Sequence, residues 1–314
     1  MKTLTKAAIA AITIAGLGSI STVAYAADPV DLPVGDIIYQ GSYDLDPSAL
    51  WSTAADGSAT LIGTPETTGL EDSTDGAWDP TTGKSYVVGN GYDGPCELWA
   101  ADVTTGQFTY LFDITVPDPE VPTENCDAFD IAPDGTAWIT LFAGQAIAKL
   151  NLTDGTTSDH VEILGEYGGV SWIAVQPTTG TVFLGDFSTD AYTIDPATGV
   201  LTVVGDADDA VEGTWYDAAF DSAGRLWITS WPEDTALYST DVADFVANIA
   251  FQGLIDGDFP TGTDSIWIPR APVVAPVEPA LAATGLETTG ALGAGLALLV
   301  LGAGAFVVAR TRRA

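Results

Sequence analysis

The sequence has little positive charge and almost no histidine. Nine of its 314 residues are Lys or Arg, whereas 43 are Asp or Glu, which gives a formal net charge of -34. Such a chain is repelled by phosphate backbones, so the composition argues against nucleic-acid binding. The single histidine, His160, falls on an expected outer strand. This excludes His-rich zinc sites and leaves Ser-His-Asp chemistry with one poorly placed candidate.

Charged and apolar residues occupy different parts of the chain. Residues 1–26 and 285–314 hold five of the nine cations, one acid and the longest apolar runs, while the 258 residues between them hold four cations and 42 acids. Nine Trp, ten Tyr and eleven Phe are far more aromatic surface than a disordered acidic segment carries. The middle is therefore expected to fold as an acidic domain between two apolar ends.

Residues 1–26 have the pattern of a secretory signal peptide. Two lysines precede an apolar run that begins at Ala7, and Ala24-Tyr25-Ala26 supplies the small residues that signal peptidase requires. The mature chain is then expected to begin at Ala27, with a short lead-in over 27–35. The alternative is a retained membrane anchor, which the interrupting Gly16 and Gly18 disfavour because they break the run before it spans the bilayer.

Residues 281–314 combine a short motif, an apolar span and a basic tail. The motif is Leu281-Ala282-Ala283-Thr284-Gly285, the uncharged span is 291–309 and the tail is 310–314. Nineteen apolar residues match the hydrocarbon core as a transmembrane helix, and the basic tail fits the positive-inside rule. A Pro-rich linker over 269–280 precedes them and is expected to be extended.

This C-terminal segment resembles the cell-wall sorting signal of Gram-positive surface proteins, in the LAxTG form associated with actinobacterial class E sortases. The resemblance implies that a sortase cleaves after Thr284 and joins it to a peptidoglycan precursor. The implied partners are therefore a class E-type sortase and the peptidoglycan precursor. It also implies a secreted, wall-bound protein that meets the membrane only transiently, through its C-terminal helix. The alternative is a plain single-pass tail anchor.

An internal repeat governs the middle of the chain. Four units each contain an apolar strand, a tight turn and an aromatic strand, and their turn glycines, Gly83, Gly135, Gly180 and Gly224, lie 52, 45 and 44 residues apart. A second hairpin follows each turn. Alternating apolar residues between Gly, Asp, Pro and Thr turns indicate antiparallel strands. Four strands in ~45 residues are typical of a propeller blade.

The two ends of the repeat array complement one another. Residues 37–62 match the last three strands of a unit, and residues 263–268 match its missing first strand. One blade made of three N-terminal strands and one C-terminal strand leaves no open sheet edge. The sequence thus predicts an all-β fold, a five-bladed β-propeller over 36–268. A pair of β-sandwiches is the alternative.

The repeat resembles the secreted bacterial propellers with YVTN, NHL and SMP-30-like repeats. That group contains lactonases, lyases, glycan binders and structural proteins, so the resemblance does not select a function. In a four-stranded blade the tight turns share one face, here called the turn face. The second-to-third and inter-blade loops share the other, here called the loop-rich face. Binding sites are expected among the irregular loops.

Two cysteines fall on the loop-rich face of neighbouring blades. Cys96 lies in a second-to-third loop and Cys126 in the next inter-blade loop. In an exported chain a disulfide is the expected state of such a pair, with two free thiols as the alternative.

Acidic residues mark the start of the innermost strand in four blades. They are Asp75, Asp127, Asp217 and Asp264. Innermost strands line the channel of a propeller, so these carboxylates are candidates for binding Ca²⁺ at its mouth. The alternative is that each aspartate caps backbone amides of its own loop.

Aromatic residues gather on the same face. The candidate ligand-binding set is Tyr43, Tyr92, Phe142, Trp172, Phe187 and Trp231. Trp172 takes the place of the channel aspartate in its blade, and each of the others follows the aromatic residue of the second strand. They are candidate platforms for sugars or other flat ligands, or they simply pack one blade against the next.

The sequence favours a wall-anchored binding or interaction protein, such as an adhesin or glycan binder, whose extracellular glycan or protein ligand contacts the loop-rich face. One alternative is a wall-anchored hydrolase or lyase acting on a polysaccharide or lactone, with the channel-mouth acids as metal ligands or acid/base groups. Five-bladed arabinanase-like glycosidases, which use three acids, are a similar case. Another is an envelope protein whose negative charge is its useful property.

Overall fold

The computed structural model describes residues 36, 38–42, 49–63, 70, 73–89, 95–116, 126–141, 144–206, 214–231, 236–245, 249–254 and 263–269. Every described residue belongs to the unit formed by residues 1–272. The predicted signal peptide and sorting signal lie outside the described residues, and so does the Pro-rich linker apart from Pro269. Within the described segments, no helix has the length and apolarity that crossing a membrane requires.

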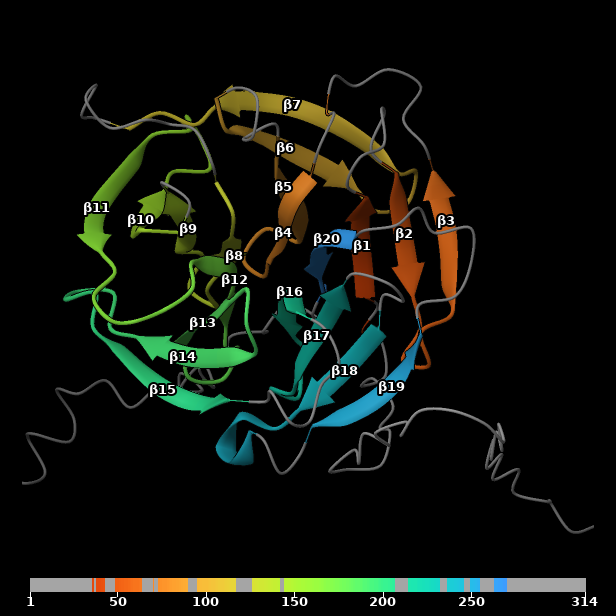
Figure 1. The fold of residues 1–314 in the computed structure, drawn as a ribbon. Helices are drawn as coiled ribbons and strands as arrows, with labels where there is room; N and C mark the ends of the chain where they lie inside the picture. Colours follow the sequence, from red (N-terminus) through yellow and green to blue (C-terminus); the bar gives the residue numbers. More distant parts are fainter. Residues whose placement is uncertain are drawn as a thin grey trace, which may run out of the picture. The chain divides into compact units, whose positions relative to one another are not determined.

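The described strands form five four-stranded antiparallel sheets around a common centre (Figure 1). Blade 1 contains β20 (Thr263–Trp267), β1 (Ile38–Ser42), β2 (Leu50–Thr53) and β3 (Ala59–Gly63). Blade 2 contains β4 (Ser73–Asp79), β5 (Lys84–Gly89), β6 (Glu97–Asp102) and β7 (Gln107–Asp113). Blade 3 contains β8 (Phe129–Ile131), β9 (Ala137–Leu141), β10 (Ala146–Leu150) and β11 (Thr157–Glu162). Blade 4 contains β12 (Val170–Val175), β13 (Val182–Asp186), β14 (Asp190–Ile194) and β15 (Leu201–Asp206). Blade 5 contains β16 (Thr214–Phe220), β17 (Leu226–Trp231), β18 (Ala236–Thr240) and β19 (Ala250–Leu254).

The innermost strands contact one another in turn, from β4 to β8, β12, β16, β20 and back to β4. This circle confirms the prediction of an all-β, five-bladed propeller. In blade 1, β20 pairs with β1 in antiparallel register, with Trp267 opposite Tyr39. The described segments contain no α-helix; a single 3-10 turn, Val242–Asp244, joins β18 to β19.

The hydrophobic core lies between neighbouring blades. The inner strands β8 and β12 are buried along their whole length, whereas the outer strands contain partly and fully exposed positions, as in β15. Two indoles fill the space that a glycine leaves on the facing strand: Trp172 lies against Gly185, and Trp267 lies against Gly76. A Cβ atom at either glycine would overlap the indole, so tight packing between strands depends on the missing side chain.

The outer rim joins blade 3 to blade 2 and blade 4 to blade 3. The turn between β10 and β11 approaches the end of β7, where Thr115 N donates 2.9 Å to Gly155 O. The turn between β14 and β15 approaches the end of β11, where Leu164 N donates 2.8 Å to Gly199 O. A Cβ at Gly199 would overlap the carbonyl of Glu162. Blade 5 has no glycine at this turn and instead buries Phe245 in the core.

Candidate functional site

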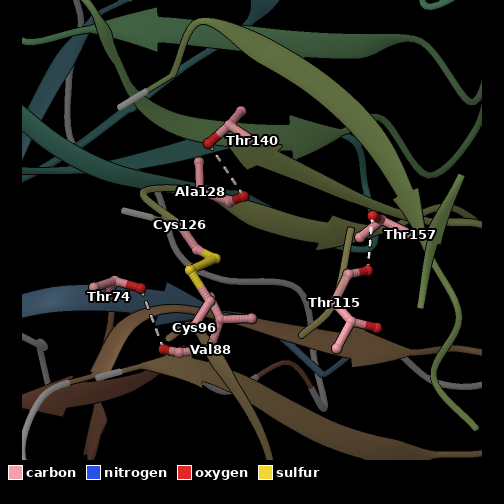
Figure 2. The surroundings of a disulfide bond; sticks show 8 residues. All are labelled: Thr74, Val88, Cys96, Thr115, Cys126, Ala128, Thr140 and Thr157. Carbon is pink, nitrogen blue, oxygen red and sulfur yellow. Dashed lines mark hydrogen bonds between the residues drawn. A yellow bond between two sulfur atoms is a disulfide. The ribbon is translucent and has the colours of Figure 1, made fainter. Parts of the chain in front are cut away.

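The predicted disulfide between Cys96 and Cys126 is confirmed (Figure 2). It joins the segment before β6 in blade 2 to the segment before β8 in blade 3, with the two Cα atoms 5.9 Å apart. Both cysteines are buried. Figure 2 shows hydrogen bonds on either side of it, from Thr74 Oγ1 to Val88 O and from Thr140 Oγ1 to Ala128 O. The disulfide therefore holds two adjacent blades together on the loop-rich face.

Two of the four predicted channel aspartates, Asp75 and Asp217, are fully buried between innermost strands. Each accepts a hydrogen bond from the backbone amide of the residue that follows it. Each also reaches the innermost strand of the next blade: Phe129 N donates 2.6 Å to Asp75 Oδ2, and Ile266 N donates to Asp217 Oδ2. Both residues therefore cap backbone amides, which was the alternative to a metal site. One amide of each pair belongs to the aspartate's own strand and the other to the next blade.

Asp130 makes the same pair of contacts in blade 3, and sequence reasoning missed it. Its Oδ1 accepts from Ile131 N at 2.7 Å and its Oδ2 accepts from Val175 N of β12 at 2.6 Å. Counted from the first residue of each tight turn, Ala128 occupies the position of Asp75 and Asp217. Asp130 lies two residues further along, on the same side of the strand. An aspartate two residues after the aligned position, on the same side of the strand, was therefore the sequence signal for this contact.

Asp75 and Asp217 are neighbouring buried carboxyl groups in the channel. Burial raises the pKa of both groups well above the usual range, and for Asp75 the nearby charge of Asp217 raises it further. The charge of Asp130 also acts to raise the pKa of Asp217. Two neighbouring carboxyl groups away from water resist carrying charge together, so the folded protein favours protonation of this pair.

The described residues give the predicted calcium site no support. Asp127 is half-buried, and its pKa is raised to about 7 by burial. The side chain of Asp264 lies outside the described part of the chain. Across the described ranges, no group of three or more His, Cys, Asp or Glu residues is arranged to hold a metal ion. The structure brings Asp75 together with Asp217 only.

The predicted aromatic set is divided by the structure. Tyr43, Tyr92, Phe142 and the side chain of Trp231 lie outside the described residues. Trp172 is completely buried between blades 4 and 5, so its assignment as a ligand contact is wrong: its indole fills the space above Gly185. Phe187, in the loop between β13 and β14, is 41% exposed.

A residue that sequence reasoning missed, Tyr216 on β16, packs beside Phe187. The ring centroids are 6.3 Å apart and the rings are inclined by 71°, an edge-to-face arrangement. The loop that carries Phe187 is held by Asp186, whose Oδ1 accepts from Ser188 N at 3.0 Å and whose Oδ2 accepts from Gly168 N at 3.1 Å. Tyr216 directly follows a buried tryptophan, Trp215. Because successive side chains on a strand point to opposite faces, this order was the signal that could have identified Tyr216.

No protein-family model matches the sequence, and no curated protein matches it. Among solved structures, the chain is similar to a protein of unknown function from Bacteroides caccae, with 13% identity over 74% of this chain and 98% of the other and a TM-score of 0.46. A protein of unknown function from Bacteroides thetaiotaomicron shares 13% identity over 75% and 62% of the two chains, with a TM-score of 0.48. A virginiamycin B lyase from Staphylococcus aureus shares 13% identity over 68% and 70%, with a TM-score of 0.41. At this identity the similarity concerns the fold alone.

Proposed function

We propose that this chain is an exported, cell-wall-anchored protein that binds an extracellular ligand on the loop-rich face of its propeller. The anchoring part rests on the sequence: the signal peptide over 1–26, the motif that ends at Thr284-Gly285 and the apolar span 291–309. The Cys96–Cys126 disulfide supports export, because disulfides persist in oxidising compartments.

One observation carries the binding part: the exposed ring of Phe187 lies against Tyr216 on the loop-rich face. Exposed aromatic rings stack on the apolar faces of sugars and on other flat ligands. The loop is already fixed by the two hydrogen bonds to Asp186, so little conformational entropy is lost when a ligand binds. Asp75 and Asp217, by contrast, are engaged in hydrogen bonds that hold blades together.

The binding proposal is tested by a glycan array with the wild-type protein and Phe187→Ala. The variant is expected to lose about tenfold or more in affinity, which is the loss of roughly one aromatic contact. Tyr110→Ala is the matched control, since Tyr110 is an aromatic residue of similar exposure on the outer strand β7. Equal binding by wild type and Phe187→Ala would count against the proposal.

The anchoring proposal is tested in the producing cell with Thr284→Ala. The variant should leave the covalent wall fraction and appear in the membrane or the medium. Muramidase digestion distinguishes the outcomes, because wall-linked protein is released with muropeptide fragments attached. If the variant still carries those fragments, sortase joining at Thr284 is wrong.

Asp127 favours a second candidate, a hydrolase or lyase that acts on a polysaccharide or lactone. A carboxyl group with a pKa of about 7 is suited to general acid or base catalysis at neutral pH, and Asp127 follows Cys126 on the loop-rich face. The test is a substrate panel of neutral polysaccharides and lactones. Activity with a pH inflection near 7 that Asp127→Asn abolishes would support this candidate, and an inactive wild-type protein would remove it.

We also propose that the pairing of β1 with β20 closes the ring and keeps the loop-rich face in shape. The register of this pairing and the contacts of β20 with β4 and β16 on either side support it.

A further inference from the structure

A groove of about 930 Å³ lies between blades 3 and 4 on the turn face, opposite Phe187 and Tyr216. Three tight turns border it: the β8–β9 turn at Pro133, the β12–β13 turn at Pro177 and the β14–β15 turn at Pro196. Its wall on blade 3 comes from β9, β10 and β11 through Trp138, Lys149 and His160. The groove therefore brings together the single histidine of the sequence, one of its few cations and an indole.

A β-bulge directs two side chains of β11 into this groove. Ile147 pairs with Val161 and Lys149 pairs with Ser158, so Asp159 and His160 together stand opposite Ala148. Within the described ranges, Asp159 is the one non-glycine residue with a positive φ, at 51°. Bulges of this kind redirect side chains and occur beside functional sites. Here the bulge places a carboxylate and an imidazole next to each other on the groove wall.

Lys149 and Asp159 place a hydrogen-bond donor beside an acceptor. Lys149 Nζ lies 2.8 Å from Asp159 Oδ2 and 5.5 Å from the centre of the Trp138 ring. The side chains of Lys149 and Asp159 are 42% and 63% exposed, so both remain accessible from the groove. Adjacent donor and acceptor groups are suited to two neighbouring hydroxyl groups, each of which both donates and accepts.

The hydrogen bonds around Thr157 determine the tautomer of the neutral His160 ring. Thr157 Oγ1 donates to Thr115 O at 3.0 Å, so its single proton is used, and it lies 2.8 Å from His160 Nε2. The imidazole therefore donates through Nε2, and its Nδ1 is an acceptor when the ring is neutral. This assignment adds a second acceptor to the wall beside Asp159.

The charge of the groove selects among ligand classes. The carboxylates of Asp134, Asp159 and Asp195 border it and repel anions. The position that would suit an organic cation, between a carboxylate and an indole, is already filled by the ammonium group of Lys149. A neutral ligand with many hydroxyl groups meets neither obstacle, and the three prolines offer it apolar surface. We propose that this groove is a second binding site and that its ligand is a neutral saccharide.

The test uses the full-length exported protein on an array of neutral oligosaccharides of roughly two to six sugars, a length that a cavity of this class holds. Sulfated oligosaccharides and spermidine are included as charged probes. The wild type should bind at least one neutral oligosaccharide, with an affinity that changes little between about 0.05 and 0.5 M NaCl. Lys149→Met and Asp159→Asn should each weaken that binding about tenfold or more. Asn tolerates the left-handed backbone of residue 159, so the second variant keeps the bulge.

Two controls separate binding in this groove from binding elsewhere on the protein. Lys84→Met removes an exposed lysine from the turn face of blade 2 and should change binding by less than about twofold. Tyr110→Ala, which removes an exposed aromatic residue outside both proposed sites, should also leave it unchanged. A saccharide held at the loop-rich face instead would lose affinity in Phe187→Ala and not in the groove variants. Thermal melts confirm that each variant is folded, and His160→Ala provides a third variant at an exposed position. The proposal is overturned if no neutral oligosaccharide binds, if the groove variants bind like the wild type, or if only the charged probes bind in a salt-dependent manner.

Discussion

The indole Nε1 of Trp267 donates a 3.0 Å hydrogen bond to Ser85 Oγ, across 182 positions of the sequence. The same indole fills the space above Gly76 and stacks on Tyr39 with ring centroids 6.0 Å apart. Trp267 therefore contacts its partner strand β1 in blade 1 and the facing strands of blade 2. The side chain of Trp267 therefore links β20, the last described strand, both to β1 and to blade 2.

Trp267→Ala is expected to destabilise the propeller by about 3–5 kcal/mol, because it empties a buried site between two blades. Ser85→Ala is the matched control and should cost about 1 kcal/mol, since it removes only the hydrogen bond. Urea unfolding followed by tryptophan fluorescence measures both.

Deleting residues 263–268 should lower the melting temperature strongly and promote aggregation through the bared edge of β1. An unchanged melting temperature in the deletion would contradict ring closure by β20.

The carboxyl pair predicts that the protein becomes more stable as the pH falls. Asp75 and Asp217 have raised pKa values in the folded state, so the folded protein holds more protons than the unfolded chain above pH ~4. Stability is then lost as the pH rises, by up to about 1.4 kcal/mol per pH unit for one proton. Unfolding measured between about pH 5 and 8 should show this slope, reduced in Asp75→Asn.

The control for that measurement is Glu166→Gln, which removes one negative charge from an exposed position. General repulsion in this acidic protein also weakens on acidification, and Glu166→Gln reports that contribution alone. The buried pair is not responsible if Asp75→Asn and Glu166→Gln give the same slope as the wild type.

Loss of the disulfide is expected to cost roughly 3 kcal/mol, since it closes a loop of 30 residues in the unfolded chain. The double variant Cys96→Ala with Cys126→Ala should show this loss in urea unfolding. Reductant should destabilise the wild type by a similar amount and leave the double variant unchanged. Equal stability of wild type and double variant would mean that the link between blades 2 and 3 adds nothing.

Gly199 in the rim turn between β14 and β15 and Gly180 in the turn between β12 and β13 offer a matched comparison of steric crowding. Gly199 and Gly180 have nearly the same φ, 73° and 71°, but only Gly199 faces a neighbouring carbonyl, that of Glu162. Gly180→Ala should cost about 1–2 kcal/mol from the left-handed backbone alone. Gly199→Ala should cost at least about 1 kcal/mol more, because the rim contact must open. Similar losses for the two variants would show that the rim contact is dispensable.

The blades and the disulfide could be predicted from the sequence because their signals are local. Tight turns need glycine in the left-handed region, and the four turn glycines repeat at nearly constant spacing. The channel was harder, because blade 3 has a tight turn one residue shorter than blade 2, and the repeat alone did not show that Asp130 follows the offset. Trp172 was assigned to a ligand because the sequence does not show that Gly185 lies opposite it.

The strand order of blade 1 also sets an order in time. Ribosomes deliver β1, β2 and β3 first and β20 last, so the first sheet begun is the last completed. Until residues 263–267 emerge, the inner edge of β1 has no partner, although four later blades can already form their own hairpins. Pairing between such distant segments is slow to form. The unpaired edge of β1 therefore exposes the nascent chain to aggregation until β20 is made.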